Sequence, residues 1–295
     1  MKTDACDALR PVGVVEIHVF LHVKLIYKHL GFFEANTNRF FMKKIVLLLC
    51  AAALFAVACE KEDPIQPEDT TTEVVVIPNA VTDIDGNSYD ALQIGKQCWM
   101  KENLRTTRYA NGTPISQGNG TSTTTAYWYY PDNNPSNKPT YGLLYNWKAV
   151  MGSSSSSSAN PSGVQGICPD GWHVPSDAEW TQLTDYVGSQ SQYVCGSDNR
   201  YIAKALAGTT GWHSCTYIYA VGNTPSQNNA TGFSALPAGS YRSDYLYFGK
   251  YAVLWGATEN NSTGAYARAL SYGDAIVSRG NYYKVNGCSV RCLRD

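Results

Sequence analysis

The sequence has few charged side chains, and the two signs nearly balance. Charged residues make up 16% of the 295 positions, against about 25% in typical soluble domains. The 23 Lys and Arg oppose 24 Asp and Glu, so the formal net charge is -1. Such a chain has no basic field to attract phosphates, and we expect no nucleic-acid partner. The apolar content of 44% is nevertheless ample for a folded core.

The sequence also lacks a comfortable membrane span, which takes about twenty apolar residues. Its clearest apolar run, residues 45–57, follows Lys43 and Lys44 and leads through Ala58 to Cys59. A basic start, a short apolar stretch and small residues before a cleavage point are typical of an export signal. Residues 42–59 resemble a bacterial lipoprotein signal peptide, with Cys59 as the lipid anchor. The alternative is an ordinary signal peptide followed by a chance cysteine.

This signal sets the expected organisation of the chain. Because an export signal is read at the N-terminus, we expect translation to start at Met42 and residues 1–41 to be a mis-called upstream extension. Residues 60–79 are expected to be a flexible tether, since they are rich in Pro, Thr and charge. Residues 60–63 resemble the Lys-plus-acidic tetrad of Bacteroidetes surface lipoproteins, although a solvated charge run is the alternative. We expect an outer-membrane location, facing the cell exterior, and one domain over residues 80–295.

The exported part contains no Cys-x-x-Cys pair and an even number of cysteines, which favours disulfides over a metal site. Cys288 and Cys292 are separated by about 13 Å if the segment is a strand, too far to bond to each other. Six cysteines allow fifteen sets of three bridges. Of these we favour Cys195 with Cys215, which bracket a local excursion, together with Cys168 with Cys292 and Cys98 with Cys288.

Catalytic signatures are also scarce. The exported part has two histidines, His173 and His213, and no Gly-x-Ser-x-Gly nucleophile turn. We expect no catalytic residue, no metal, no cofactor and no enzymatic activity. Paired carboxylates for sugar hydrolysis stay open as an alternative, drawn from Asp177, Glu179, Asp244, Glu259 and Asp274.

The segment GICPDGWHVPSDAEWTQL, residues 166–183, is either an active site or a structural staple. Ser176 and Glu179 are spaced as a capping box, which predicts a helix that starts there and ends near Gly188. Trp180 would lie on its buried face. We interpret the segment as structural, with His173 partly buried near a turn.

Elsewhere, apolar spacing and turn residues predict further elements. Asp85-Gly86 predicts a hairpin turn, and residues 97–104 a buried strand. The spacing of apolar residues over 142–152 predicts a helix. Residues 249–260, 265–272 and 287–295 are expected to be strands.

Six motifs in order are similar to a known family: QCWMKENLR, YGLLYNWKAV, GICPDGWHVPSDAEW, GFSALPAG, LWGATEN and SVRCLRD. They resemble the Fibrobacter succinogenes major paralogous domain, found in surface lipoproteins and without an established enzymatic activity. The resemblance implies an α+β fold, C-type-lectin-like and related to formylglycine-generating enzymes. It implies twisted antiparallel strands, two to three helices, long loops and terminal strands side by side.

In lectin-like folds, loops near the later strands usually bind the ligand. Aromatic faces stack on sugars or peptides, and Asn, Asp and Arg supply hydrogen bonds. The candidate ligand-binding residues are Glu259, Asn260, Asn261, Arg268, Tyr272, Asp274, Arg279, Tyr282 and Tyr283. Residues 259–261 lack the Pro of the calcium-carbohydrate tripeptide, so calcium is not expected.

These expectations lead to three functional hypotheses. The first is an adhesin-like domain that binds an extracellular glycan or protein. The alternative is a structural or assembly subunit of a surface appendage. The third, less favoured, is an enzyme related to formylglycine-generating or glycan-processing proteins.

Overall fold

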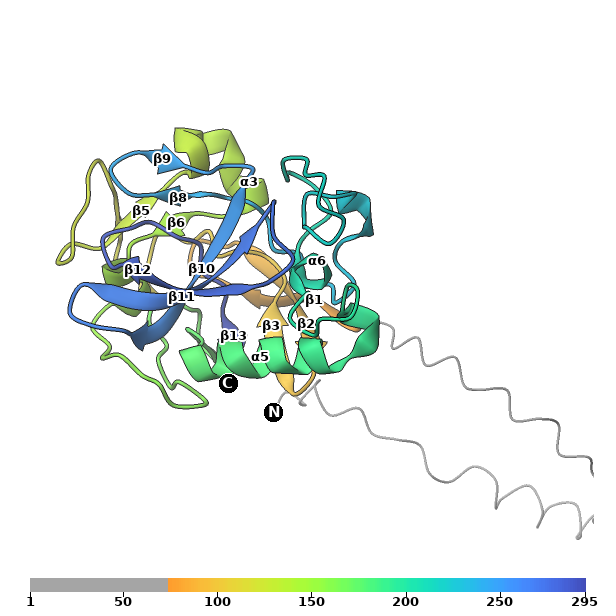
Figure 1. Cartoon of the computed structure of the whole chain (residues 1–295). Helices are drawn as coiled ribbons and strands as arrows, with labels where there is room; N and C mark the ends of the chain where they lie inside the picture. Colours follow the sequence, from red (N-terminus) through yellow and green to blue (C-terminus); the bar gives the residue numbers. More distant parts are fainter. Residues whose placement is uncertain (1–73) are drawn as a thin grey trace, which may run out of the picture. The chain divides into compact units, whose positions relative to one another are not determined.

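Two antiparallel sheets form the framework of residues 74–295, the part of the chain that this computed structural model describes, and loops connect them (Figure 1). Residues 1–73, with the expected signal peptide, Cys59 and most of the expected tether, lie outside the described residues. The first sheet has the order β1-β2-β3-β13-β7. Its strands are β1 (Val76–Thr82), β2 (Ser88–Ile94), β3 (Gln97–Met100), β13 (Leu293–Arg294) and β7 (Trp172–His173). β1 therefore begins inside the segment expected to be tether.

The second sheet is built from three longer consecutive strands and is accompanied by two small sheets. It has the order β10-β11-β12, and the small sheets are β4-β5-β6 and β8-β9. The bounds are β10 (Tyr251–Glu259), β11 (Gly264–Ser271), β12 (Ser278–Tyr283), β4 (Ser116–Gln117), β5 (Tyr127–Tyr129), β6 (Leu144–Tyr145), β8 (Ser240–Tyr241) and β9 (Tyr245–Leu246).

Helices are few and mostly one turn long. They are α3 (Lys138–Tyr141), α4 (Trp147–Met151), α5 (Asp177–Ser189) and α6 (Ala203–Leu206). Short 3-10 turns are η2 (Pro131–Asn133), η3 (Pro135–Asn137), η4 (Ser191–Tyr193) and η5 (Pro225–Gln227). The fold class is therefore α+β, with more sheet than helix.

The β1–β2 hairpin forms where Asp85-Gly86 predicts it. Gly86 has a φ of 82°, which a glycine adopts without the clash that a side chain would cause. The Asp83 carboxylate accepts hydrogen bonds from the backbone N–H groups of Asp85 and Asn87 at 3.0 and 2.9 Å. The turn is thus fixed by its own residues, which confirms the prediction.

Strands β3 and β10 are buried on both faces, because two core clusters meet at them. On β3, Cys98 and Met100 belong to one cluster and Trp99 to the other. On β10, Trp255 belongs to the cluster of Cys98 and Met100, and Leu254 belongs to the cluster of Trp99. This is why these strands are continuous apolar runs in the sequence rather than alternating ones.

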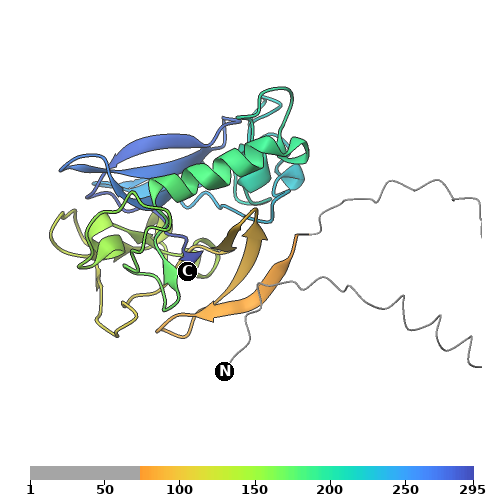
Figure 2. The ribbon, with the colours of Figure 1, turned by 90° about the horizontal axis from the view of Figure 1, so that it is seen from below.

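Helix α5 lies along the β10-β11-β12 sheet and also contacts β2 (Figure 2). The predicted capping box is present: the Ser176 hydroxyl accepts from Glu179 N–H at 3.2 Å, and the Glu179 carboxylate accepts from Ser176 N–H at 2.8 Å. The Trp180 ring lies 4.6 Å from that of Trp99, and its indole N–H donates to Trp255 O at 3.3 Å. The helix is therefore fixed between two sheets.

The predicted helix over residues 142–152 is only partly right. Residues 144 and 145 form β6, and the helix α4 starts after Asn146. The Asn146 side chain accepts from Ala149 N–H at 3.0 Å, which makes it the N-cap. Apolar spacing alone missed this cap, so the helix is shorter than predicted.

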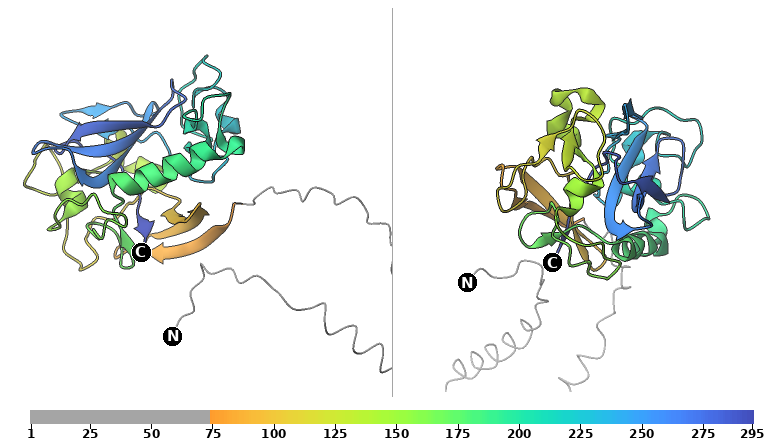
Figure 3. Two further views of the ribbon diagram at one scale, coloured as in Figure 1. Left: turned by 60° about the horizontal axis from the view of Figure 1, so that its bottom comes forward. Right: turned by 90° about the vertical axis from the view of Figure 1, so that its left-hand side faces the viewer.

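The C-terminal segment runs between the sheets and bonds to both. Cys288 pairs with Tyr145 on β6, Ser289 pairs with Leu254 on β10, and Leu293 lies between Trp99 and His173. Figure 3 shows the C-terminus beside the strands of the first sheet. The predicted strand over 287–295 is thus extended, although only β13 is a regular strand. The N-terminal strand β1 and the C-terminal strand β13 lie in one sheet with β2 and β3 between them, so the expected side-by-side terminal strands share a sheet but are not neighbours.

One of the three expected disulfides is present. Cys168 and Cys292 are bonded, with their Cα atoms 6.0 Å apart. The bond ties the segment before β7 to the C-terminal segment, which are 124 residues apart in sequence.

The Cys98–Cys288 prediction is wrong. Leu293 pairs with Trp99, the neighbour of Cys98, whereas Cys288 pairs with Tyr145. The residues between Cys288 and Leu293 span roughly 16 Å when extended. A disulfide allows a Cα separation of about 7 Å at most, so the two thiols lie too far apart to bond.

The Cys195–Cys215 prediction is also wrong, because both half-buried thiols are unbonded. Cys195 N–H donates to Tyr201 O at 2.9 Å, and Cys215 N–H donates to Gly222 O at 3.0 Å. Each cysteine therefore closes its own loop through backbone hydrogen bonds.

Candidate functional site

The nine candidate ligand-binding residues do not form one site. Glu259, Asn260 and Asn261 lie at the turn between β10 and β11, whereas Tyr272 and Asp274 follow β11 at its other end. A strand of this length separates the two groups by roughly 20 Å. Most of the nine are also engaged with other protein groups.

The two candidate arginines hold α5 on the second sheet. Arg268, only 3% exposed, donates to Asp177 Oδ1 at 2.7 Å and to Thr181 Oγ1 at 2.9 Å. Arg279 donates to the same carboxylate at 2.9 Å and lies 3.6 Å over the Tyr266 ring. Burial raises the pKa of Asp177, but hydrogen bonds from both arginines outweigh burial and lower it. The guanidinium groups are thus structural.

The β10–β11 turn is likewise internally bonded. The Asn261 side chain accepts from Thr263 N–H and Gly264 N–H at 3.0 and 2.9 Å. The Tyr266 hydroxyl donates to Asn260 Oδ1 at 2.5 Å. Lys284 donates to Glu259 at 2.7 Å. The polar side chains of this turn are therefore hydrogen-bonded within the protein and stabilise the conformation of the turn.

The remaining candidates differ in exposure. Asp274 Oδ1 accepts from Ala275 N–H at 2.7 Å, closing a local turn, and the Tyr272 ring lies 6.1 Å from that of His213. Tyr282 is half-buried against Trp255, and burial raises its pKa to about 12. Tyr283 is 52% exposed. Its side chain is the only one of these three tyrosines that is mainly on the surface.

His173 belongs to a buried network of ionisable side chains. Its Nε2 lies 2.8 Å from Glu179 Oε1 and its Nδ1 lies 2.6 Å from Asp295 Oδ1. Both ring nitrogens are therefore occupied, and the side chain is 3% exposed. The other Glu179 oxygen accepts from Ser162 N–H at 3.1 Å. This confirms the structural interpretation of residues 166–183, with His173 more deeply buried than expected.

A cavity of about 520 Å³ lies elsewhere, between a short hairpin, the end of α4 and the loop at residues 165 and 166. Its volume is within the range of about 300 to 1,000 Å³ typical of ligand pockets. The lining residues are Tyr109, Ala110, Asn111, Thr113, Pro114, Ala126, Lys148, Met151, Gly152, Ser153, Ser154, Gln165 and Gly166.

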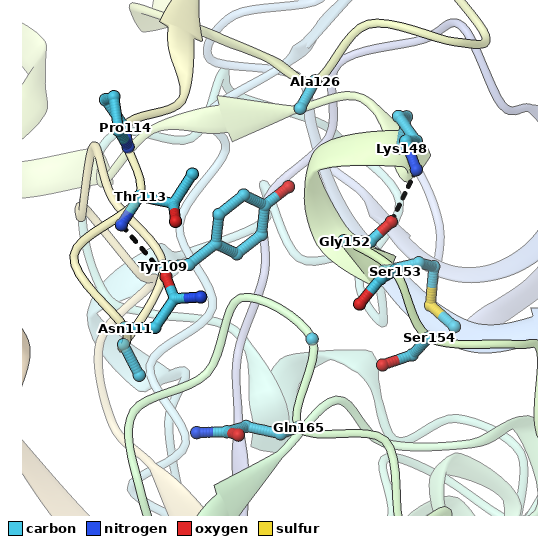
Figure 4. A pocket seen from close by; sticks show the side chains of 13 residues that line it. Tyr109, Asn111, Thr113, Pro114, Ala126, Lys148, Gly152, Ser153, Ser154 and Gln165 are labelled. Atoms are coloured by element: carbon cyan, nitrogen blue, oxygen red, sulfur yellow. Dashed lines mark hydrogen bonds between the residues drawn. The ribbon is translucent and has the colours of Figure 1, made fainter.

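The hairpin that forms one wall is held by local hydrogen bonds. Arg108 pairs with Pro114, and Tyr109 N–H donates to Thr113 O at 3.0 Å. Gly112 has a φ of 84°, which the Asn-Gly turn requires. Thr113 N–H donates to Asn111 Oδ1 at 3.0 Å (Figure 4). The hairpin thus has a fixed shape that presents Tyr109 to the cavity.

Close packing positions the opposite walls. A Cβ on Gly166 would lie 2.2 Å from Val150 O, so only glycine lets this loop approach α4 so closely. Lys148 Nζ donates to Gly152 O at 2.6 Å across the last turn of α4. Gln165 Nε2 donates to Asp170 at 2.7 Å. The polar side chains around the cavity are therefore oriented by protein contacts.

Tyr109 provides the aromatic surface of the cavity. Figure 4 shows its ring between Asn111 on one side and Lys148 on the other. Burial raises the pKa of Tyr109 to about 12, so the phenol is neutral at physiological pH and can donate a hydrogen bond. The arrangement offers a stacking face surrounded by hydroxyl, amide and ammonium groups.

A second cavity, of about 380 Å³, lies between α5 and residues near 199–202 and 276–277. The residues that line it include no aromatic side chain, and its Arg200 already donates to Asp198 at 2.6 Å. It is the weaker candidate for recognition of a ring-shaped ligand.

Within residues 74–295, no group of three or more His, Cys, Asp or Glu side chains is placed to hold a metal ion. None of the helices formed by these same residues has the length and apolar character that crossing a membrane requires.

Sequence reasoning missed the cavity between the hairpin and α4. The dipeptide Asn111-Gly112 is a strong hairpin signal, and it could have located one wall. Nothing in the sequence indicates that this hairpin faces Lys148 and Gln165.

The sequence motifs of the domain are those of a known family. The Fibrobacter succinogenes major domain model matches residues 92–294, which include every residue that lines the cavity. The chain belongs to this family, and the resemblance of its motifs is confirmed. Neither a curated protein nor a solved structure matches the chain.

Proposed function

We propose that this protein is a surface-exposed, lipid-anchored lipoprotein whose lectin-like domain binds an extracellular glycan. The anchor would be Cys59, in the segment with the features of a lipoprotein signal. The binding site would be the cavity around Tyr109 rather than the loops of the later strands. The domain would act by binding, not by catalysis.

One observation carries this proposal: the cavity combines a single aromatic ring with a surround of small polar groups. Sugar rings have apolar faces that stack on aromatic side chains and hydroxyl edges that hydrogen-bond to amides and hydroxyls. Tyr109 supplies the ring, and Asn111, Ser154 and Gln165 supply the polar edge. A volume of about 520 Å³ suits one or two sugar units better than a folded protein surface.

The chemistry of the lining residues favours binding over catalysis. Hydrolysis of a glycosidic bond ordinarily takes two carboxyl groups that flank the scissile bond. The residues that line the cavity include no Asp, Glu, His or Cys. Paired-carboxylate catalysis is therefore not favoured at this cavity. Two of the candidate carboxylates, Asp177 and Glu179, lie elsewhere and are hydrogen-bonded to Arg268 and His173.

A glycan array tests the proposal, with purified protein and two tyrosine variants. Tyr109→Ala removes the stacking ring, and we expect a loss of affinity of up to about tenfold, since an aromatic contact contributes about 0.5–1.5 kcal/mol. Tyr283→Ala is the matched control, because Tyr283 is exposed and lies outside the cavity. Thermal melting would check that both variants fold.

Two results would contradict the proposal. If Tyr283→Ala abolishes binding and Tyr109→Ala does not, the site lies on the later strands. If folded wild-type protein binds no glycan on a broad array, glycan recognition itself is wrong.

A further inference from the structure

The cavity around Tyr109 has a charge of one sign. Lys148 is the only charged residue among those that line it. The Asp170 carboxylate contacts a lining side chain but does not itself line the cavity, since it accepts from Gln165 Nε2 at 2.7 Å. Arg108, next to the hairpin, lies 3.3 Å from Asp85. A bound ligand would therefore meet one cation and no lining carboxylate.

Lys148 is held with its ammonium group at the edge of the cavity. One of its three N–H bonds donates to Gly152 O at 2.6 Å. This bond fixes the ammonium above the end of α4, at the side of the cavity toward which the Tyr109 hydroxyl points (Figure 4). The side chain is half-buried, so its charge is less screened than that of a fully exposed lysine.

Asn111 adds a directed donor on the opposite wall. Its Oδ1 accepts from Thr113 N–H at 3.0 Å, which leaves the Nδ2 group for the cavity. Figure 4 shows this amide nitrogen pointing inward beside the Tyr109 ring. Donors thus approach the cavity from two sides, and the neutral phenol of Tyr109 adds a third.

From this arrangement we propose that the ligand is an acidic sugar, a pyranose that bears a carboxylate of the uronic-acid type. This inference rests on the proposed glycan-binding function and specifies its substrate class. The carboxylate would bind to the Lys148 ammonium, the Asn111 amide would donate to a sugar oxygen, and the ring would stack on Tyr109.

Other small anions and zwitterions fit less well. A free amino acid would bring an ammonium group into a cavity whose lining has no carboxylate to pair with it. A compact dianion such as phosphate could bind the Lys148 ammonium, but it has no ring face to stack on Tyr109. A sugar carboxylate spreads one charge over two oxygens and keeps its ring on the aromatic face.

Calorimetric titration tests the inference with matched ligands. The probes are tetrasaccharides of galacturonate, glucuronate and mannuronate, each with its carboxyl-reduced neutral form of the same linkage. We expect wild-type protein to bind at least one acidic form about tenfold or more tightly than its reduced form. The difference should shrink at high ionic strength, because a partly exposed charge pair is screened by salt.

Two lysine variants assign that difference to one residue. Lys148→Met should bring the affinity for the acidic form down to that for the reduced form while binding of the reduced form persists. Lys96→Met is the matched control: it removes the same charge from an exposed position outside the cavity and should leave the preference intact.

The outcomes separate the inference from the proposed function. Equal binding of acidic and reduced forms by wild-type protein would overturn the acidic-sugar inference and leave glycan binding standing. A preference that survives Lys148→Met would overturn the role of this residue. If no form of any tetrasaccharide binds, while other glycans do, the inference fails alone; if no glycan binds at all, both fail.

Discussion

His173 is buried between two carboxylates, which favour its charged form. Burial by itself lowers the pKa of a histidine, but the hydrogen bonds of Glu179 and Asp295 outweigh it and raise the pKa of His173. In its charged form the ring donates from both nitrogens and so links the start of α5 to the C-terminal segment.

This network predicts a pH dependence of stability. Because the pKa of His173 is raised on folding, its contribution is fully present below the unfolded value of about 6.5. It is lost as the pH rises through the higher folded value, so the free energy of unfolding should fall over that interval. Urea unfolding between pH 6 and 9 measures this.

Variants assign the slope to His173. His173→Gln should lower stability by about 3 kcal/mol, since it leaves Glu179 buried without its cationic partner, and should flatten the slope. His213→Gln, at an exposed position, should keep the wild-type slope. An unchanged slope in His173→Gln would contradict the assignment.

For a single residue, the sequence gives the chemical character of the side chain but not the group that the side chain contacts in the fold. Arg268 and Arg279 have the side chains of a binding surface, yet both are committed to Asp177 on α5, far away in sequence. The carboxylate that engages them is visible only once α5 is placed on the second sheet. Tyr282 and Tyr283 are adjacent and identical in type, yet only Tyr283 is exposed, and the fold rather than the sequence determines this difference.

Helix α5 depends on its N-terminal cap, and the capping box leads to a prediction at the scale of the element. Ser176→Ala removes the acceptor for Glu179 N–H and should destabilise the protein by about 1 kcal/mol. Ser176→Thr keeps the hydroxyl and should lose less. Thermal unfolding compares the two, and equal stability of wild type and Ser176→Ala would contradict the cap's contribution.

Elements with strong local signals were predictable from the sequence. The capping box gave α5, Asp85-Gly86 gave the first hairpin, and apolar runs gave β10 and β11. The stretch 142–152 was predicted as one helix because its apolar spacing is helical, but Leu144 pairs with Tyr129 on β5. Tertiary pairing overrode the local pattern there.

At the scale of the molecule, one disulfide joins segments that are 124 residues apart. A disulfide that closes so long a loop reduces the conformational entropy of the unfolded chain. The double variant Cys168→Ala with Cys292→Ala should therefore lower the free energy of unfolding by about 2–5 kcal/mol. Cys195→Ala with Cys215→Ala is the matched control and should cost far less, because these thiols are unbonded. Denaturant titration measures both.

Alkylation gives an independent check of the same assignment. After denaturation without reductant, iodoacetamide should label Cys195 and Cys215 and spare Cys168 and Cys292. Labelling of Cys168, or protection of Cys195, would contradict the bonding described here.

The cavity is a property of the whole domain, which is why the sequence did not locate it. Its walls come from a hairpin near residue 110, the end of α4 and a loop at residue 165. Each wall has a local cause, such as the turn at Gly112 or the close approach at Gly166. Their meeting depends on packing between segments that share no sequence pattern.

The cavity around Tyr109 is the proposed ligand site, and a crystal structure of the protein with the strongest glycan of the array would locate the ligand. We expect a sugar ring stacked on Tyr109 between Asn111 and Lys148. A glycan bound instead over Tyr282 and Tyr283, with this cavity empty, would contradict it.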